Sequence, residues 1–87
     1  MKLKVTSKIH EILKRDLGFA EFASKQLKYE MHPLEKKFAM SWKVFLAKFE
    51  EGKLEDDRIW FKWYALASAA LDWDETKIEI QKALTTS

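Results

Sequence analysis

The sequence predicts an all-α fold, a small bundle of four to five helices that forms a single domain over residues 1–87. Apolar side chains recur every three to four residues along most of the chain, which is typical of amphipathic helices. Only one proline and two glycines interrupt the 87 residues, so few positions oppose a helix. Alternation typical of strands is confined to residues 2–6 and to Ile78 and Ile80, too little for a sheet. Residues 1–6 are expected to be a flexible or loosely docked arm.

The composition favours a cytoplasmic protein without disulfides. The chain contains no cysteine, which excludes a disulfide framework and a thiolate metal site. No apolar run approaches the roughly 20 residues of a membrane span and no signal peptide is recognisable, so we expect a cytoplasmic location without membrane contact. Residues 1–43 carry ten Lys or Arg against five Asp or Glu, whereas residues 44–87 carry six against nine. Solvated helix faces, an acidic half that suits a basic partner, or a basic half that touches nucleic acid would each explain this asymmetry.

Two helices are expected in the first third of the chain, over residues 7–17 and 19–31. Thr6 or Ser7 is suited to cap the first of them. Gly18 stands where a helix commonly ends in the left-handed conformation, so we expect it to separate the two helices. The apolar side chains of both helices form their expected core-facing stripes: Ile9, Ile12, Leu13, Leu17, Phe19, Phe22, Ala23, Leu27 and Met31.

A third helix is expected over residues 33–51. Proline suits the first position of a helix and disfavours helical geometry in the residue before it, so Pro33 indicates a new start. Two interpretations remain for its middle: one unbroken helix, or a break at 40–41 with Ser41 as the N-cap of a further helix. Gly52 then ends the helix.

The helix expected over residues 56–71 is the element around which the others must be arranged. Asp56 and Asp57 are interpreted as its caps rather than as a metal or acid–base pair, because a helix N-terminus offers free N–H groups and positive partial charge. At about 100° per residue, its apolar side chains fall on two sides. Both sides need cover, from the chain itself, a second copy or another protein.

A last helix is expected over residues 74–84, followed by a frayed end. Asp72 or Asp74 is interpreted as its start; if Asp74 is the N-cap, Trp73 and Ile78 stand at the two positions of a hydrophobic staple. The apolar face of this helix continues through Ile80.

The sequence contains no arrangement of residues typical of an enzyme. The two glycines are too far apart for a phosphate-binding loop, and no serine lies in a nucleophile motif. His10 and His32 are distant in sequence, so no metal site and no cofactor are predicted. We therefore predict no catalytic residues and no enzymatic activity.

Large apolar side chains on helices are the residues from which we predict binding sites. Aromatic side chains are favoured in protein interfaces, which makes three residues of the helix over 56–71 the leading candidates for partner binding: Trp60, Phe61 and Tyr64. Secondary candidates come from the region around the possible break: Met40, Trp42 and Val44. A weaker, basic nucleic-acid site would consist of Lys4, Lys8 and Arg15.

Short motifs between residues 38 and 71 follow one another in a recognisable order. They are Phe38-Ala39-Met40-Ser41, then Phe45 and Phe49, then Gly52-Lys53-Leu54-Glu55-Asp56-Asp57, then Trp60-Phe61-Lys62-Trp63-Tyr64-Ala65-Leu66. This order resembles a group of small helical prokaryotic proteins that are regarded as antitoxin components of toxin–antitoxin pairs. The resemblance covers less than half of the chain.

The resemblance implies roles for several of these residues. Ser41 would cap a helix, Gly52 would end it, and Trp63 and Leu66 would belong to the core. The group commonly has acidic residues after the Met-Ser pair and before the tryptophan. This chain departs from that pattern, with a more aromatic and more basic set: Trp42, Lys43, Val44 and Lys62.

The function implied by the resemblance is that of a non-enzymatic protein-binding module, an antitoxin that masks a partner toxin. The partner is expected to be another protein, such as a basic nuclease-type toxin, a second copy in a dimer, or both. Two alternatives stay open: a self-associating helical accessory protein of the phage or mobile-element type, and a weak nucleic-acid binder that uses its basic N-terminal half.

Overall fold

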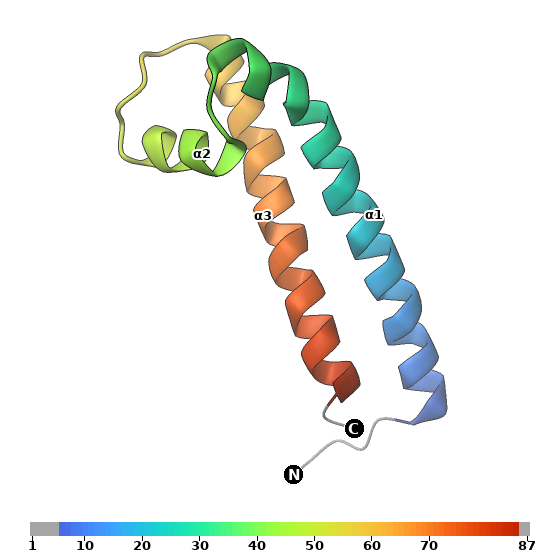
Figure 1. Ribbon diagram of the computed structural model, residues 1–87. Coiled ribbons are helices and arrows are strands. Elements are labelled where there is room, and N and C mark those ends of the chain that lie inside the picture. Colours follow the sequence, from blue (N-terminus) through green and yellow to red (C-terminus); the bar gives the residue numbers. More distant parts are fainter. Residues whose placement is uncertain (1–5, 86–87) are drawn as a thin grey trace.

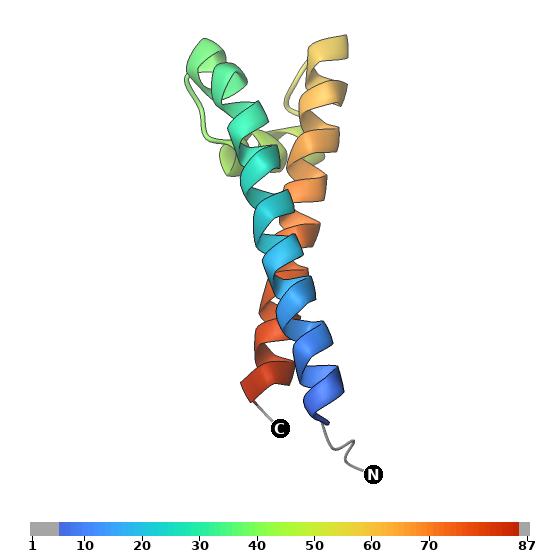
Figure 2. The same cartoon turned by 90° about the vertical axis from the view of Figure 1, so that its right-hand side faces the viewer.

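The computed structural model describes residues 6–85 and contains three helices in that range: α1 Ser7–Phe38, α2 Trp42–Glu50 and α3 Arg58–Thr85 (Figure 1). The predicted all-α class is confirmed, with three helices in place of the expected four to five. Helices α1 and α3 run antiparallel as a long hairpin, and α2 lies crosswise at the end where α1 ends and α3 begins (Figures 1 and 2). The predicted arm lies outside the described residues except for Thr6.

Helix α1 is one continuous helix of 32 residues, so the expected helices over 7–17 and 19–31 are not separate. Thr6 is the N-cap, and its hydroxyl accepts the Ile9 N–H at 3.2 Å. Gly18 does not end the helix; the positive φ angles in the described chain belong to Ala39 and Gly52. A helix passes through glycine at a cost of only about 1 kcal/mol, which packing along α3 outweighs.

The predicted helix start at Pro33 is wrong, because Pro33 lies inside α1. Met31 before it is fully buried, and Leu34 and Phe38 after it pack against the same core. These contacts on both sides hold the backbone helical although proline removes one N–H. The helix ends six residues later at Ala39, which takes the left-handed conformation with φ 51° and ψ 44°.

The structure decides between the two interpretations of residues 33–51 in favour of the break. Ser41 caps α2, and its hydroxyl accepts the Val44 N–H at 3.2 Å. The Glu35 carboxylate accepts the Trp42 N–H at 2.8 Å, which satisfies a second donor of this helix N-terminus. Gly52 follows the end of α2 with φ 71°, as predicted.

Helix α3 begins after Asp57, whose carboxylate accepts the Ile59 N–H at 3.2 Å, so capping by this residue is confirmed. It then continues for 28 residues, and the predicted start of a separate helix at Asp74 is wrong. The staple of Trp73 with Ile78 is also wrong, since Trp73 contacts Phe19 with ring centroids 5.4 Å apart. No proline or glycine interrupts α3, and its apolar spacing persists through this region.

One series of buried and half-buried positions in each of α1 and α3 runs in steps of three and four residues, the spacing of an antiparallel coiled-coil seam. In α1 they are Leu13, Leu17, Ala20, Ser24, Leu27, Met31, Leu34 and Phe38. In α3 they are Trp63, Leu66, Ala70, Trp73, Lys77, Ile80 and Leu84. The two helices cross along the hairpin and diverge at the end where α2 lies (Figure 2).

The sealed part of the core lies where α2 covers the hairpin. Trp63, Phe45 and Met31 are its largest fully buried side chains. Beyond α2, the described residues form two helices only, and seam residues such as Leu17 and Ile80 are half-buried. In the described residues, no helix has an apolar stretch of the length and composition required to cross a membrane.

Candidate protein-interaction surface

Aromatic side chains gather where α2 packs against the first two turns of α3. We call this cluster the aromatic rim and define it as Phe49, Trp60, Phe61 and Tyr64. The Phe49 ring stacks on Tyr64 with centroids 4.4 Å apart and meets Phe61 edge-on at 5.6 Å. Phe61 is 56% exposed, whereas the other three members are half-buried. The rim therefore offers a partner one projecting ring on a packed aromatic base.

Of the three leading candidates from the sequence, the structure brings Phe61 and Tyr64 together and packs Trp60 against the rings of the core. Trp60 lies 4.6 Å from Phe38 between ring centroids, so α1 covers one side of its indole. Tyr64 and Phe61 share Phe49 as a neighbour. The core of this chain thus covers part of the Trp60 and Tyr64 side chains, whereas the Phe61 side chain projects from the surface.

The secondary candidates do not form one surface with the rim. Met40 is half-buried and packs against the core. Trp42 is buried at 8% exposure, with the Lys28 ammonium 5.8 Å and the Lys43 ammonium 5.6 Å from its ring centroid. Val44 is exposed on α2. Of these three residues, only Val44 is an exposed side chain.

The connection from α2 to α3 is acidic and adjoins the rim in sequence. Residues 50–57 contain five Asp or Glu against one Lys, and Lys53 is paired with Glu51 at 2.8 Å. Within the described chain, no three acidic or histidine side chains converge in a way that would hold a metal ion. Glu55 and Asp56 remain exposed. Their charge lies beside an aromatic surface, an arrangement that complements a basic protein.

Two of the three predicted nucleic-acid residues, Lys8 and Arg15, lie at the far end of the hairpin from the rim. Lys8 and Arg15 are exposed on the first turns of α1, and Arg15 Nε is 3.9 Å from Asp16 Oδ1. Lys4 lies outside the described residues. Acidic side chains at Glu11 and Asp16 interrupt this basic edge, so it is a weak electrostatic footprint for a phosphate backbone.

The sequence interpretation missed an exposed pair of aromatic residues on the outside of α1. Phe22 is 60% and Tyr29 is 70% exposed, and with Lys25 and Gln26 they line a shallow hollow. Phe22 was expected in the core, and this expectation is wrong, as it is for the exposed Phe19. The signal that locates them is the seam spacing, because Phe22 and Tyr29 fall outside the series that contains Ala20 and Ser24.

A polar cluster ties α1 to α3 in the middle of the hairpin. The Ser24 hydroxyl donates to Asp74 Oδ1 at 2.6 Å, and the Lys28 ammonium lies 2.9 Å from Asp74 Oδ2. Burial raises the pKa of Asp74, but the bonds from Ser24 and Lys28 and the charges of Lys28 and Lys77 outweigh it, so the pKa falls below 3.8. The Asp74 carboxylate is thus ionised and bound to Ser24 and Lys28, so it links α3 to α1 and is not a proton donor.

Comparison with known proteins adds no relative: no protein-family model, no curated protein and no solved structure matches this chain. Among the described residues, the aromatic rim and the acidic connection beside it form the surface most suited to bind another protein.

Proposed function

We propose that this chain is a non-enzymatic protein-binding module, an antitoxin that neutralises a partner toxin by covering its working surface with the aromatic rim. The observation that carries the proposal is the 56% exposure of Phe61, whose ring meets the half-buried Phe49 where Phe49 stacks on the half-buried Tyr64. A projecting aromatic ring on a packed base is the form that interface hot spots take. The resemblance of residues 38–71 to antitoxins supports the same function.

The energetics of such an interface are sufficient. A large aromatic side chain buries about 150–250 Å², and burial contributes about 25 cal/mol per Å². Covering Phe61 and the remaining exposed parts of Trp60 and Tyr64 therefore contributes several kcal/mol before the cost of association is subtracted. The rim needs no chemistry of its own, because occlusion alone inactivates a toxin.

Packing within the rim reduces the entropy that binding loses. Phe49 holds Tyr64 by stacking and Phe61 by an edge contact, while Phe38 and Phe45 lie 4.6 and 5.7 Å from Trp60 between centroids. Side chains that are ordered before binding lose little rotamer freedom at the interface. This order favours a rim that binds without rearrangement.

The acidic connection over residues 50–57 indicates the charge of the partner. Carboxylates at the edge of an interface act mainly on the association rate and on the choice of partner. A basic nuclease-type toxin has the complementary charge, since a protein that binds nucleic acid presents Lys and Arg on its working surface. Binding is therefore expected to slow as salt is added.

Coexpression with the product of the adjoining reading frame tests the proposal. That product alone is expected to stop growth of the host, and this chain is expected to restore it. Phe61→Ala should prevent rescue and weaken binding of the purified proteins about 30-fold or more, the loss of a hot-spot residue. Circular dichroism should show that the variant remains helical.

Phe22→Ala is the matched control, because Phe22 is equally exposed at 60% but lies on α1 away from the rim. It should rescue growth as the unsubstituted chain does. The proposal fails if Phe61→Ala neutralises normally, if Phe22→Ala is the variant that loses binding, or if the adjoining frame encodes no toxic protein.

A further inference from the structure

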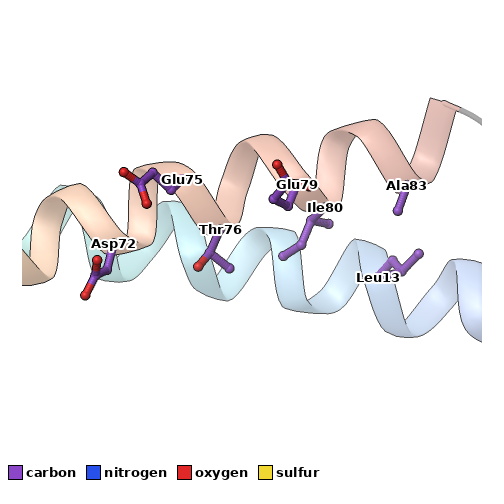
Figure 3. A pocket seen from close by; sticks show the side chains of 7 residues that line it. All are labelled: Leu13, Asp72, Glu75, Thr76, Glu79, Ile80 and Ala83. Atoms are coloured by element: carbon purple, nitrogen blue, oxygen red, sulfur yellow. The ribbon is translucent and has the colours of Figure 1, made fainter.

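The hairpin beyond α2 has a shallow hollow on its side, at the end opposite the rim. Its apolar lining comes from both helices: Leu13 from α1, and Ile80 and Ala83 from α3 (Figure 3). Figure 3 shows these side chains between the two ribbons, at the level of the first turns of α1. The hollow is therefore part of the seam itself, at a place where the described residues provide no third helix to cover it.

Burial along the seam differs between the two halves of the molecule. Under α2, the largest seam side chains, Met31 and Trp63, are fully buried, although Leu34 and Leu66 are half-buried. In the other half, the small Ala20 is buried, but the larger Leu17 and Ile80 are only half-buried. A two-helix layer cannot enclose its own apolar seam, so this half needs a further layer, as α2 provides for the first.

The dimensions of the molecule agree with a missing layer. The chain exposes 6755 Å², whereas a compact protein of 10.3 kDa exposes about 5,400 Å². Its radius of gyration is 16.6 Å against about 12 Å for a compact domain of this length, and its extents are 49 × 25 × 17 Å. The excess surface is larger than the roughly 800 Å² that one partner buries in a standard interface.

The charges around the hollow identify what would cover it. Asp72, Glu75 and Glu79 border the hollow and are exposed (Figure 3). Among the described residues, Asp72 and Glu75 form no ion pair, and Glu79 has only Lys82, at 3.5 Å. Within the part of the chain that the structure describes, the border is therefore negative and largely uncompensated, which favours a basic apolar occupant.

The first turns of α1 have the complementary character. Lys8 and Arg15 are exposed there, and so is the apolar Ile9. The Arg15 side chain is 76% exposed, and its contact with Asp16 is a loose 3.9 Å. This edge lies at the same end of the hairpin as the hollow (Figure 1). A two-fold axis along the hairpin would keep the edge of each copy level with the hollow of the other.

We propose that the chain forms a symmetric dimer in which two hairpins pair through the half that α2 leaves uncovered. The basic edge of α1 in one copy lies in the acidic hollow of the other, with Arg15 facing Glu79 across the interface. Two-fold symmetry repeats the same contact in the opposite direction. The four helices make an antiparallel bundle that buries Leu13 and Ile80 in both copies. The two rims lie at the opposite end and stay free, so formation of the dimer does not depend on whether the rim binds a toxin.

The oligomeric state of the full chain tests this proposal. Sedimentation equilibrium should give twice the 10.3 kDa of the chain. Glu79→Arg and Arg15→Glu should each raise the dissociation constant about tenfold or more, because each places like charges opposite one another. The double variant, with the charges exchanged, should recover most of the lost affinity. Both positions are exposed, so the variants should remain helical in circular dichroism.

Two control variants separate this surface from the rim. Lys48→Glu makes a comparable charge change on exposed α2, and Phe61→Ala alters the rim; both should leave the dimer intact. A chain that stays monomeric at every concentration overturns the proposal. A dimer that is insensitive to the two single charge reversals, or whose double variant does not recover, overturns it as well.

Discussion

The indole of Trp63 and the ring of Phe45 stack face to face, with centroids 4.0 Å apart and an interplanar angle of 4°, and both side chains are fully buried. This contact joins the middle turns of α2 to α3 and lies at the centre of the enclosed core. The Trp63 Nε1–H is buried and finds no hydrogen-bond acceptor among the described residues. The core therefore gains apolar contact from this tryptophan and gives up one hydrogen bond.

Substitution of Trp63 separates these two effects. Trp63→Ala should lower the free energy of unfolding by about 3–5 kcal/mol, because it leaves a cavity under α2. Trp63→Phe should cost distinctly less, since it keeps a ring against Phe45 and removes an N–H whose unpaired burial costs about 1–3 kcal/mol. Urea unfolding followed by circular dichroism measures both. Tyr29→Ala, at a residue 70% exposed, is the control and should change stability by less than about 0.5 kcal/mol. Equal losses for Ala and Phe at position 63 would contradict this account.

The two glycines should respond oppositely to alanine. Gly18 is inside α1, and a Cβ there meets nothing within 4 Å, so Gly18→Ala should stabilise the protein by about 0.5–1 kcal/mol. Gly52 also has open space, but its φ of +71° is strained for any L side chain, so Gly52→Ala should destabilise by about 1–2 kcal/mol. Thermal unfolding of the two variants measures the difference. If Gly18→Ala were destabilising, α1 would not be a continuous helix at this position.

The link through Asp74 should make stability depend on pH in the acid range. The pKa of Asp74 in the folded protein is below its ordinary 3.8, so the unfolded chain binds the proton more readily. The stabilisation of the fold by the ionised Asp74 is complete at a pH above the ordinary pKa. It is lost as the pH falls through the lower pKa that Asp74 has in the folded protein. At neutral pH, Asp74→Asn should cost about 1.5–3 kcal/mol, the contribution of hydrogen bonds to a charged group.

The pH dependence distinguishes this link from simple packing. The difference in unfolding free energy between the unsubstituted protein and Asp74→Asn should shrink as the pH is lowered into the acid range, because the asparagine does not titrate. Urea unfolding at several pH values measures it. A difference that stays constant across this range would mean that the charge of Asp74 contributes nothing.

Local chemistry in the sequence located most of the helix boundaries that the structure contains. Thr6, Ser41 and Asp57 are caps because a short polar side chain before an apolar repeat accepts free N–H groups. Gly52 ends α2 because it takes a positive φ at little cost. These are interactions within a few residues, so a sequence contains all the partners they require.

The expected boundaries at Gly18, Pro33 and Asp74 were wrong for a common reason. Each residue has a local preference that opposes or starts a helix, and each lies where α1 and α3 pack along a shared seam. Asp74 shows this most directly: its carboxylate binds Ser24 and Lys28, fifty and forty-six residues away in sequence, instead of the N–H groups of its own helix. Interactions over that separation outweigh a local preference of about 1 kcal/mol.

The sequence by itself determined the all-α class, the caps and the concentration of aromatic residues between 38 and 71, because periodicity and capping are properties of neighbouring residues. Only the tertiary structure decided which apolar side chains are covered. Trp63 is sealed beneath α2, Phe61 projects two residues earlier on the same helix, and Phe22 faces away from α3. Burial depends on which helices pack together and where a covering helix ends, and neighbouring residues do not fix that arrangement.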